Sequence, residues 1–230
     1  MAGFEQGFVV YKKAYLFYEV VFLKGILFSL FVMSFTVILS SCGFSTDSKN
    51  NVMVESKIMN YEESCKYLKE MNLIEDGDNP PLLDKMPQYD DEEPFGINFF
   101  RTDISDVDLS NLTIPRTYFG RTEIKNVSFK FTNLSESNVC WNDLIEVDFT
   151  NANLSNCDMR ASIYKNVKFN YANLENVDFR YSSFENCDFT GAVMKGVKIT
   201  KEKASLLKLE DEQIDEISWK NSEGEEPNGG

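Results

Sequence analysis

A large apolar residue recurs at every fifth position from Ile104 to Ile199, through twenty consecutive steps. An α-helix would repeat about every 3.6 residues and a strand every two, so neither element explains this spacing. A chain that presents one such side chain every five residues, without a slip, must turn a corner at each step. The sequence therefore predicts a solenoid whose core is this column of large side chains.

The positions around each large residue are also patterned. The residue two positions earlier is small, with Leu112 and Asn142 as exceptions, and an Asp or Asn often lies between the two. Over residues 97–200 this motif resembles the pentapeptide-repeat family. The resemblance implies an all-β solenoid, a right-handed four-sided (quadrilateral) β-helix in which each coil hydrogen-bonds to the next and like side chains stack.

A second period of 20 residues indicates how the repeats are arranged. The segments KNVSFKFTNL, from Lys125, and KNVKFNYANL, from Lys165, align without gaps, and Phe129, Phe149 and Phe169 then fall in one column. Four repeats therefore make one coil, and twenty repeats make about five coils. At roughly 4.8 Å between hydrogen-bonded strands, this predicts a rod on the order of 24 Å long.

The composition divides the chain into four segments. They are a signal peptide at residues 1–41, an acidic tether with one short helix at 42–96, the repeats at 97–200, and a helical cap with a disordered acidic tail at 201–230. Asn60 and Glu63 have the spacing of a capping box, which predicts a helix over YEESCKYLKEM. After Thr200, apolar residues at helical spacing predict one or two short helices that close the end. Family members often pair through a C-terminal helix, so segment 210–219 is either a homodimer contact or a cap.

The first 41 residues have the features of an export signal. Lysines precede an apolar run from Gly25 to Leu39, and small residues follow it. The sequence Leu-Ser-Ser-Cys resembles a bacterial lipobox, which implies that Cys42 carries lipid and anchors the mature protein to a membrane outside the cytoplasm. Two alternatives remain open: the run is an uncleaved anchor, or translation starts at Met33 and the protein is cytoplasmic.

Charge is distributed unevenly along the chain. The whole sequence has 23 basic and 37 acidic residues, but the repeats at 97–200 contain eleven basic and thirteen acidic ones. The best-known activity of pentapeptide-repeat proteins is mimicry of DNA toward gyrase-type topoisomerases, which requires negative charge along the rod. That function is the alternative prediction, for a cytosolic inhibitor or protector. Direct nucleic-acid binding is not expected, because an acidic chain lacks the basic stripe that phosphates require.

The sequence shows no arrangement of catalytic residues. It contains no histidine, which removes histidine-based nucleophilic catalysis and histidine metal ligands, and its five cysteines show no CxxC spacing. We therefore expect no enzyme activity, no cofactor and no metal site. Cys157 and Cys187 occupy small inward positions on opposite walls, which predicts core fillers rather than a disulfide.

The outward positions give one indication of a binding surface. An aromatic and arginine strip along one edge has the composition that interfaces favour, and its members are Arg121, Trp141, Arg160, Arg180 and Tyr181. Alternatively, the rings lie flat over a corner and the arginines are solvated or pair with neighbouring acids. Phe131 and Tyr171 on another edge have the same ambiguity. The leading prediction is a non-catalytic binding or structural module of a bacterial lipoprotein, with an unidentified protein or envelope component as partner.

Overall fold

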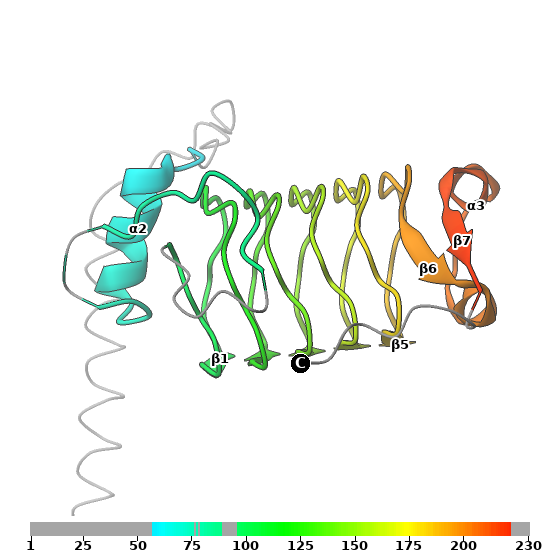
Figure 1. The fold of residues 1–230 in the computed structure, drawn as a ribbon, viewed down its shortest axis with the longest axis horizontal. Coiled ribbons are helices and arrows are strands. Elements are labelled where there is room, and N and C mark those ends of the chain that lie inside the picture. Colours follow the sequence, from blue (N-terminus) through cyan, green and yellow to red (C-terminus); the bar gives the residue numbers. More distant parts are fainter. Residues whose placement is uncertain (1–56, 76, 78, 89–95, 222–230) are drawn as a thin grey trace, which may run out of the picture. The chain divides into compact units, whose positions relative to one another are not determined.

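The computed structural model describes residues 57–75, 77, 79–88 and 96–221 (Figure 1). The predictions for residues 1–41, Cys42, the start at Met33 and the tail from residue 222 lie outside the described residues. Among the described helices, none has the length and apolar character needed to cross a membrane.

The repeat region folds as a four-sided β-solenoid. One side is a five-stranded parallel sheet in chain order, and its strands are β1 (Ile104–Ser105), β2 (Glu123–Lys125), β3 (Asp143–Ile145), β4 (Ile163–Lys165) and β5 (Ser183–Glu185). Each strand pairs with the residues 20 positions further along, as Ile124 does with Leu144. Single β-bridges on the other three sides keep the same register of 20. The predicted fold, with four repeats per coil, is confirmed.

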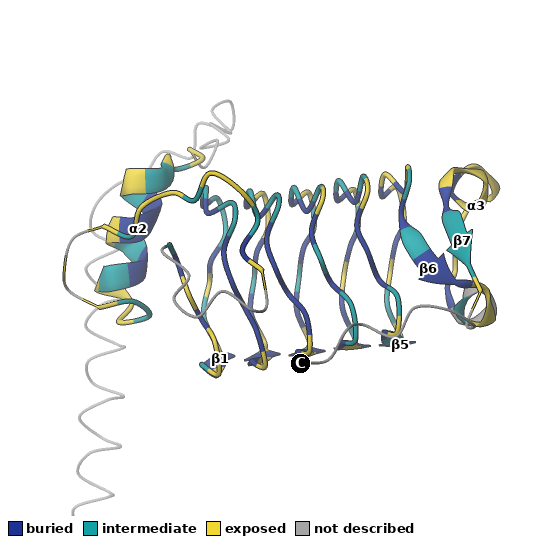
Figure 2. Cartoon of the chain, in the orientation of Figure 1, coloured by how far each residue is buried: buried dark blue, intermediate teal, exposed yellow. Residues whose placement is uncertain are grey.

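Phenylalanine rings stack through the interior, as the 20-residue period predicts. The centroids of Phe129 and Phe149 lie 5.2 Å apart, those of Phe149 and Phe169 5.4 Å, and those of Phe169 and Phe189 4.8 Å. All four side chains are at most 2% exposed. Figure 2 shows that buried residues, in dark blue, recur in every coil of the solenoid. Offset or parallel stacks of this kind add to the free energy gained from apolar burial.

Each corner of a coil has a residue in the left-handed backbone region. Asn126, Asn166 and Asn186 occupy such positions with φ between 52° and 55°, and Asn tolerates this conformation well. Bulky residues occupy others, as Trp141 does with φ 61° and Tyr171 with φ 56°. For these residues the left-handed conformation costs about 1 kcal/mol or more. A change from an aromatic residue to Asn at a corner therefore removes the ring without adding backbone strain.

A ladder of inward polar side chains links successive coils, with one flaw. The backbone N–H of Asn142 donates to Ser162 Oγ (3.1 Å), and the N–H of Thr122 donates to Asn142 Oδ1 (2.7 Å). Asn142 is 1% exposed, and its Nδ2 is a buried donor with no partner. Such an unpaired buried group costs roughly 1–3 kcal/mol. Asn142, an exception to the repeat motif in the sequence, is thus an imperfect fit in the structure.

We expect Asn142→Ser to raise the free energy of unfolding by about 1 kcal/mol, because a hydroxyl keeps the acceptor for Thr122 and removes the unpaired donor. Urea denaturation of the two chains measures the difference. Asn173→Ser is the matched control, since the Asn173 amide donates to Asn153 Oδ1 (3.2 Å) and should not be improved. A lower stability of Asn142→Ser than of the wild type would contradict the expectation.

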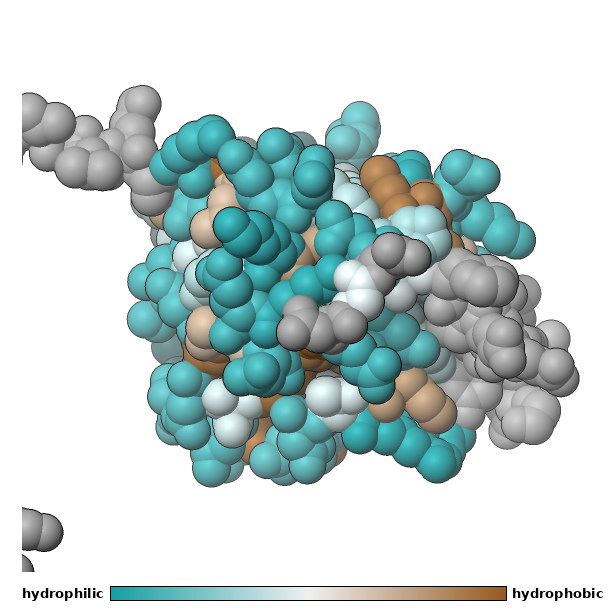
Figure 3. Space-filling model, turned by 90° about the vertical axis from the view of Figure 1, so that its left-hand side faces the viewer, coloured by the Kyte–Doolittle hydropathy of each residue, from teal (hydrophilic) through white to brown (hydrophobic). Residues whose placement is uncertain are grey.

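Helix α2 (Tyr61–Glu70) covers the N-terminal end of the solenoid. Asn60 and Glu63 form the predicted capping box, and Leu68 is fully buried against the first coil. Polar groups at the open edge of this coil find partners in the cap: the N–H of Thr113 donates to Ser64 Oγ (2.8 Å), and Tyr67 Oη donates to the carbonyl oxygen of Asp108 (2.7 Å). Figure 3, which faces this end, shows mostly hydrophilic side chains over it.

Part of the predicted tether lies against the coils. Arg116 Nη1 donates to the carbonyl oxygen of Leu83 (2.7 Å), and Asn138 Nδ2 donates to that of Pro87 (3.3 Å). Because Arg116 and Asn138 belong to consecutive coils, the segment 79–88 runs across the strands rather than along one of them. This segment therefore ties the first two coils together.

The C-terminal end is closed by helices and by one further strand. The 3₁₀-helix η1 (Lys201–Leu206) and helix α3 (Asp211–Glu216) correspond to the predicted cap. Gln213 on α3 donates from Nε2 to the carbonyl oxygens of Phe189 and Ala192, both at 2.8 Å. Strand β7 (Ser218–Lys220) then pairs in parallel with β6 (Lys198–Thr200), again in a register of 20. The solenoid thus makes about six turns, one more than the repeat motif alone.

Candidate functional site

The predicted contact strip divides into two kinds of residue. Arg121, Trp141 and Tyr181 lie at the same corner of the coils, with Ala161 between Trp141 and Tyr181 in that column, and Trp141 is 52% exposed. Arg160 and Arg180 lie beside that corner, and each guanidinium pairs with the Asp two residues earlier in its own coil. The structure therefore places the strip residues together, with Arg160 and Arg180 in ion pairs with neighbouring acids.

The pairing of Arg160 with Asp158 fixes the charge of this aspartate. Burial works against ionisation of Asp158, but the hydrogen bonds from Arg160, at 2.8 and 2.6 Å, together with the charge of Arg160 and the Cys140 thiol, hold the pKa of Asp158 below its ordinary value. The guanidinium of Arg160 is correspondingly less available to an outside partner. The aromatic side chains are the more accessible part of the strip.

The described cysteines lie in the core or at its margin and form no disulfide with one another. Cys157 is buried, its thiol donates to the carbonyl oxygen of Leu134 (3.1 Å), and burial raises its pKa to about 12. Cys187 is partly buried, and burial raises its pKa also. A raised pKa suppresses the thiolate, so neither thiol is set up as a nucleophile. No cluster of three potential metal-ligating side chains occurs within the described part of the chain.

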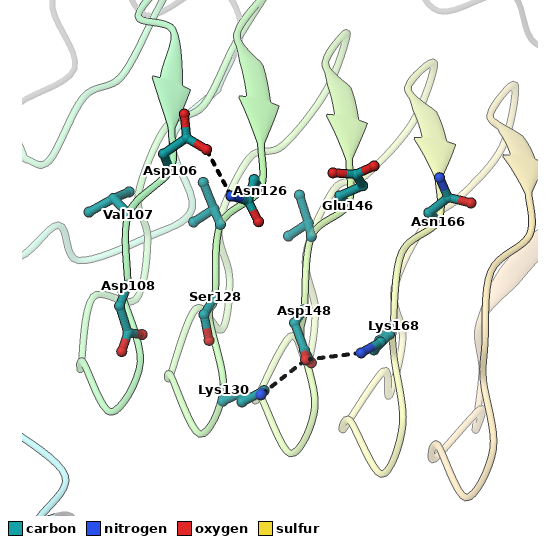
Figure 4. Close-up of a pocket in the computed structure, with 12 residues that line it drawn as sticks. Asp106, Val107, Asp108, Asn126, Ser128, Lys130, Glu146, Asp148, Asn166 and Lys168 are labelled. Carbon is teal, nitrogen blue, oxygen red and sulfur yellow. Dashed lines mark hydrogen bonds and ion pairs between the residues drawn. The ribbon is translucent and has the colours of Figure 1, made fainter.

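A shallow groove of about 750 Å³ runs along another face, across four successive coils (Figure 4). Its two margins are rows of outward side chains: Asp106, Asn126, Glu146 and Asn166 at a corner, and Asp108, Ser128, Asp148 and Lys168 two residues later. The lining is completed by Lys130 and, between the rows, by Val107, Val127 and Val147. We call this surface the polar groove.

Four carboxylates and two amines determine the electrostatics of the polar groove. Asp148 Oδ2 pairs with Lys130 Nζ at 3.2 Å and with Lys168 Nζ at 3.8 Å. Burial disfavours the charged form of Asp148, yet hydrogen bonds from Thr150 and the pairing with Lys130 keep its pKa below the ordinary value. Asp106 Oδ1 accepts a hydrogen bond from Asn126 Nδ2 (2.7 Å). Because its pKa is lowered, Asp148 is ionised near neutral pH and is suited to accept hydrogen bonds rather than to act as a general acid.

Two aromatic side chains stand at the corner beyond the groove. Phe131 directly follows the groove residue Lys130 and is 47% exposed, and Tyr171 in the same column is 63% exposed. The Tyr171 ring lies against Gly191 of the next coil, where Cδ1 would be 2.5 Å from any added Cβ. Gly191 is therefore needed for this placement, and the ring rests on the corner. At about 4.8 Å per coil, the two rings are roughly 9.6 Å apart along the rod.

Sequence reasoning missed the polar groove, although it noted Phe131 and Tyr171. The repeat motif draws attention to inward positions, whereas the groove is made by outward ones. A reading of the outward positions in steps of 20 would have grouped Asp106, Asn126 and Glu146 in one row. Grouping the outward positions still does not indicate how deep the groove is, because its depth depends on the side-chain conformations of the two rows.

Comparisons with known proteins identify the repeats. Residues 122–160 and 165–196 match the family model for pentapeptide repeats, in eight copies. A search of curated proteins finds no match.

Solved structures with the same kind of repeat overlap the chain only partly. The pentapeptide-repeat protein Rfr23 from the cyanobacterium Cyanothece 51142 is 17% identical, covers 42% of this chain and 80% of its own, and has a TM-score of 0.41. A pentapeptide-repeat protein of the Arabidopsis thaliana thylakoid lumen, AT2G44920, is 20% identical over 51% of this chain and 68% of its own, with a TM-score of 0.22. QnrB1, described as a plasmid-mediated fluoroquinolone resistance protein, is 19% identical over 38% and 50%, with a TM-score of 0.28. The partial similarity to these solved structures carries no information about ligands. The repeats themselves identify the fold: the chain carries pentapeptide repeats folded as a right-handed, four-sided β-solenoid.

Proposed function

We propose that the protein is a non-catalytic binding module, displayed outside the cytoplasm of a bacterium by a lipid on Cys42. The observation that supports binding is the polar groove, an open surface with donors and acceptors repeated along four coils. The sequence Leu-Ser-Ser-Cys after an apolar run supports the lipid anchor. The corner with Trp141 and Tyr181 is a second proposed contact surface on the same rod.

The anchor is tested by Cys42→Ala. In cells fed with a clickable fatty acid, the wild-type chain should become labelled, and Cys42→Ala should lose essentially all of the label and leave the membrane fraction. Cys187→Ala is the control, since this cysteine lies in the repeat domain and its loss should keep the label. An unlabelled wild type would refute the lipid anchor. Equal membrane association of wild type and Cys42→Ala would favour the uncleaved anchor, and a mature chain starting at Met33 would favour the cytoplasmic form.

The alternative function, protection or inhibition of a gyrase-type topoisomerase, is decided by a supercoiling assay with excess purified chain. Several rod carboxylates are already neutralised by ion pairs, including Glu136 with Arg116 (2.8 Å) and Glu175 with Lys195 (2.7 Å). This pairing weakens the negative field that DNA mimicry requires. We therefore expect no inhibition, and inhibition at stoichiometric protein would replace our proposal.

A further inference from the structure

We infer that the polar groove binds a neutral glycan chain lying along the rod axis, with sugar rings resting on Phe131 and Tyr171. This inference rests on the proposed function as a binding module and names the ligand class of one of its surfaces. It follows from the shape of the groove, the balance of its polar groups and the placement of the two rings.

The shape favours a chain molecule over a compact one. The groove crosses four coils and presents similar polar groups at each step, as Asp106, Asn126, Glu146 and Asn166 do along its corner margin. These groups recur about every 4.8 Å along the rod. A ligand that uses them in succession must itself be an extended chain with polar groups at regular intervals.

The hydrogen-bonding groups that the groove leaves open to a ligand belong to side chains rather than to the main chain. The coil carbonyls and N–H groups beside the groove bond to the neighbouring coils, as the N–H of Ser128 does to the carbonyl oxygen of Val107 and that of Asp148 to Val127. An extended peptide could therefore add no strand at this wall. Of the central valines, Val127 is 2% and Val147 1% exposed, which leaves little surface for an apolar ligand.

The charges select against a polyanion. Both lysines of the groove already pair with Asp148, while Asp108 and Glu146 form no ion pair with another described residue. A phosphate or sulfate chain would meet net negative charge. Hydroxyl groups, by contrast, donate to carboxylates and accept from lysine and amide nitrogens, so a neutral polyol can satisfy both kinds of group in the groove.

The aromatic corner supplies the apolar part of glycan recognition. The C–H face of a pyranose ring packs on an aromatic ring, and this contact needs a ring face open to solvent. Tyr171 meets this need, because it rests on Gly191 and remains 63% exposed. Phe131 lies two coils away in the same column, at the corner just beyond the same margin of the groove, so both rings can contact one ligand chain.

The test uses the full chain and calorimetric titration with maltohexaose and with the hexamer of N-acetylglucosamine. At least one hexasaccharide should bind, and Tyr171→Asn and Phe131→Asn should each weaken it by about tenfold or more. Glu136→Asn is the control, since it also places Asn at a left-handed corner, but outside the groove and outside both proposed contact surfaces. It should leave the affinity within about twofold. Unfolding midpoints verify that all three variants fold.

Several outcomes would overturn the inference. Among them are the binding of neither hexasaccharide, an equal loss of affinity in Glu136→Asn, and tighter binding of hexalysine or dextran sulfate than of the sugars. The ligand could be part of a polymeric glycan or a free small sugar, and the length of the oligosaccharide distinguishes the two. A polymeric glycan predicts that the hexamer binds more tightly than the corresponding disaccharide. Equal binding of the disaccharide would indicate a free sugar and would refute binding along the rod axis. Failure of these titrations is distinguishable from failure of the proposed function, because fatty-acid labelling of Cys42 and binding of hexalysine are measured independently.

Discussion

Phe149→Ala is expected to lower the free energy of unfolding by about 3–5 kcal/mol. The Phe149 ring lies between those of Phe129 and Phe169, at centroid distances of 5.2 and 5.4 Å, and is 2% exposed. Its removal leaves a cavity in the middle of the stacked core, where each coil packs only against its two neighbours. Urea denaturation followed by circular dichroism measures the loss.

The matched control for this prediction is Phe131→Ala, because Phe131 is the same residue type in the adjacent coil and its side chain is 47% exposed. We expect it to change stability by less than about 0.5 kcal/mol. A loss in Phe149→Ala no larger than that in Phe131→Ala would show that the stack does not carry the stability of the rod. This comparison tests the core without reference to any ligand.

The second large effect is expected from Leu68→Asp in the N-terminal cap. Leu68 is fully buried where α2 meets the first coil, so the substitution removes apolar burial and places a charge in the same space. The expected loss is about 4 kcal/mol or more. Detachment of α2 would also leave the edge groups that now bond to Ser64 and Tyr67 without partners. We therefore expect the variant to associate at high concentration through its open edge.

Lys66→Asp is the control on the same helix, since Lys66 is exposed and makes only a weak contact with Glu70 at 3.9 Å. Its stability should fall by less than about 0.5 kcal/mol, and it should remain as dispersed as the wild type. Chemical denaturation and light scattering measure the two properties. A Leu68→Asp chain that unfolds and scatters like Lys66→Asp would show that α2 is not needed as a cap.

Of the candidate surfaces, the sequence predicted which side chains share an edge but not what they contact. Arg160 and Arg180 were correctly placed beside the corner of Trp141, because residues 20 apart must stack. Their pairing with Asp158 and Asp178 depends on side-chain rotamers, which the repeat does not specify. For the same reason, the hydrogen bonds and depth of the polar groove came only from the structure.

The amino-acid sequence was enough to predict the solenoid, its register of 20 and the helix that begins after Asn60, because periodicity and capping depend on residues close together in the chain. Three features became visible in the folded chain alone: Arg116 and Asn138 hold the segment 79–88 against two coils, β7 adds a turn, and the Tyr171 ring lies on Gly191. These features join residues far apart or depend on the room left by a neighbouring coil. Such contacts form only after the coils have stacked, so no local pattern in the sequence predicts them.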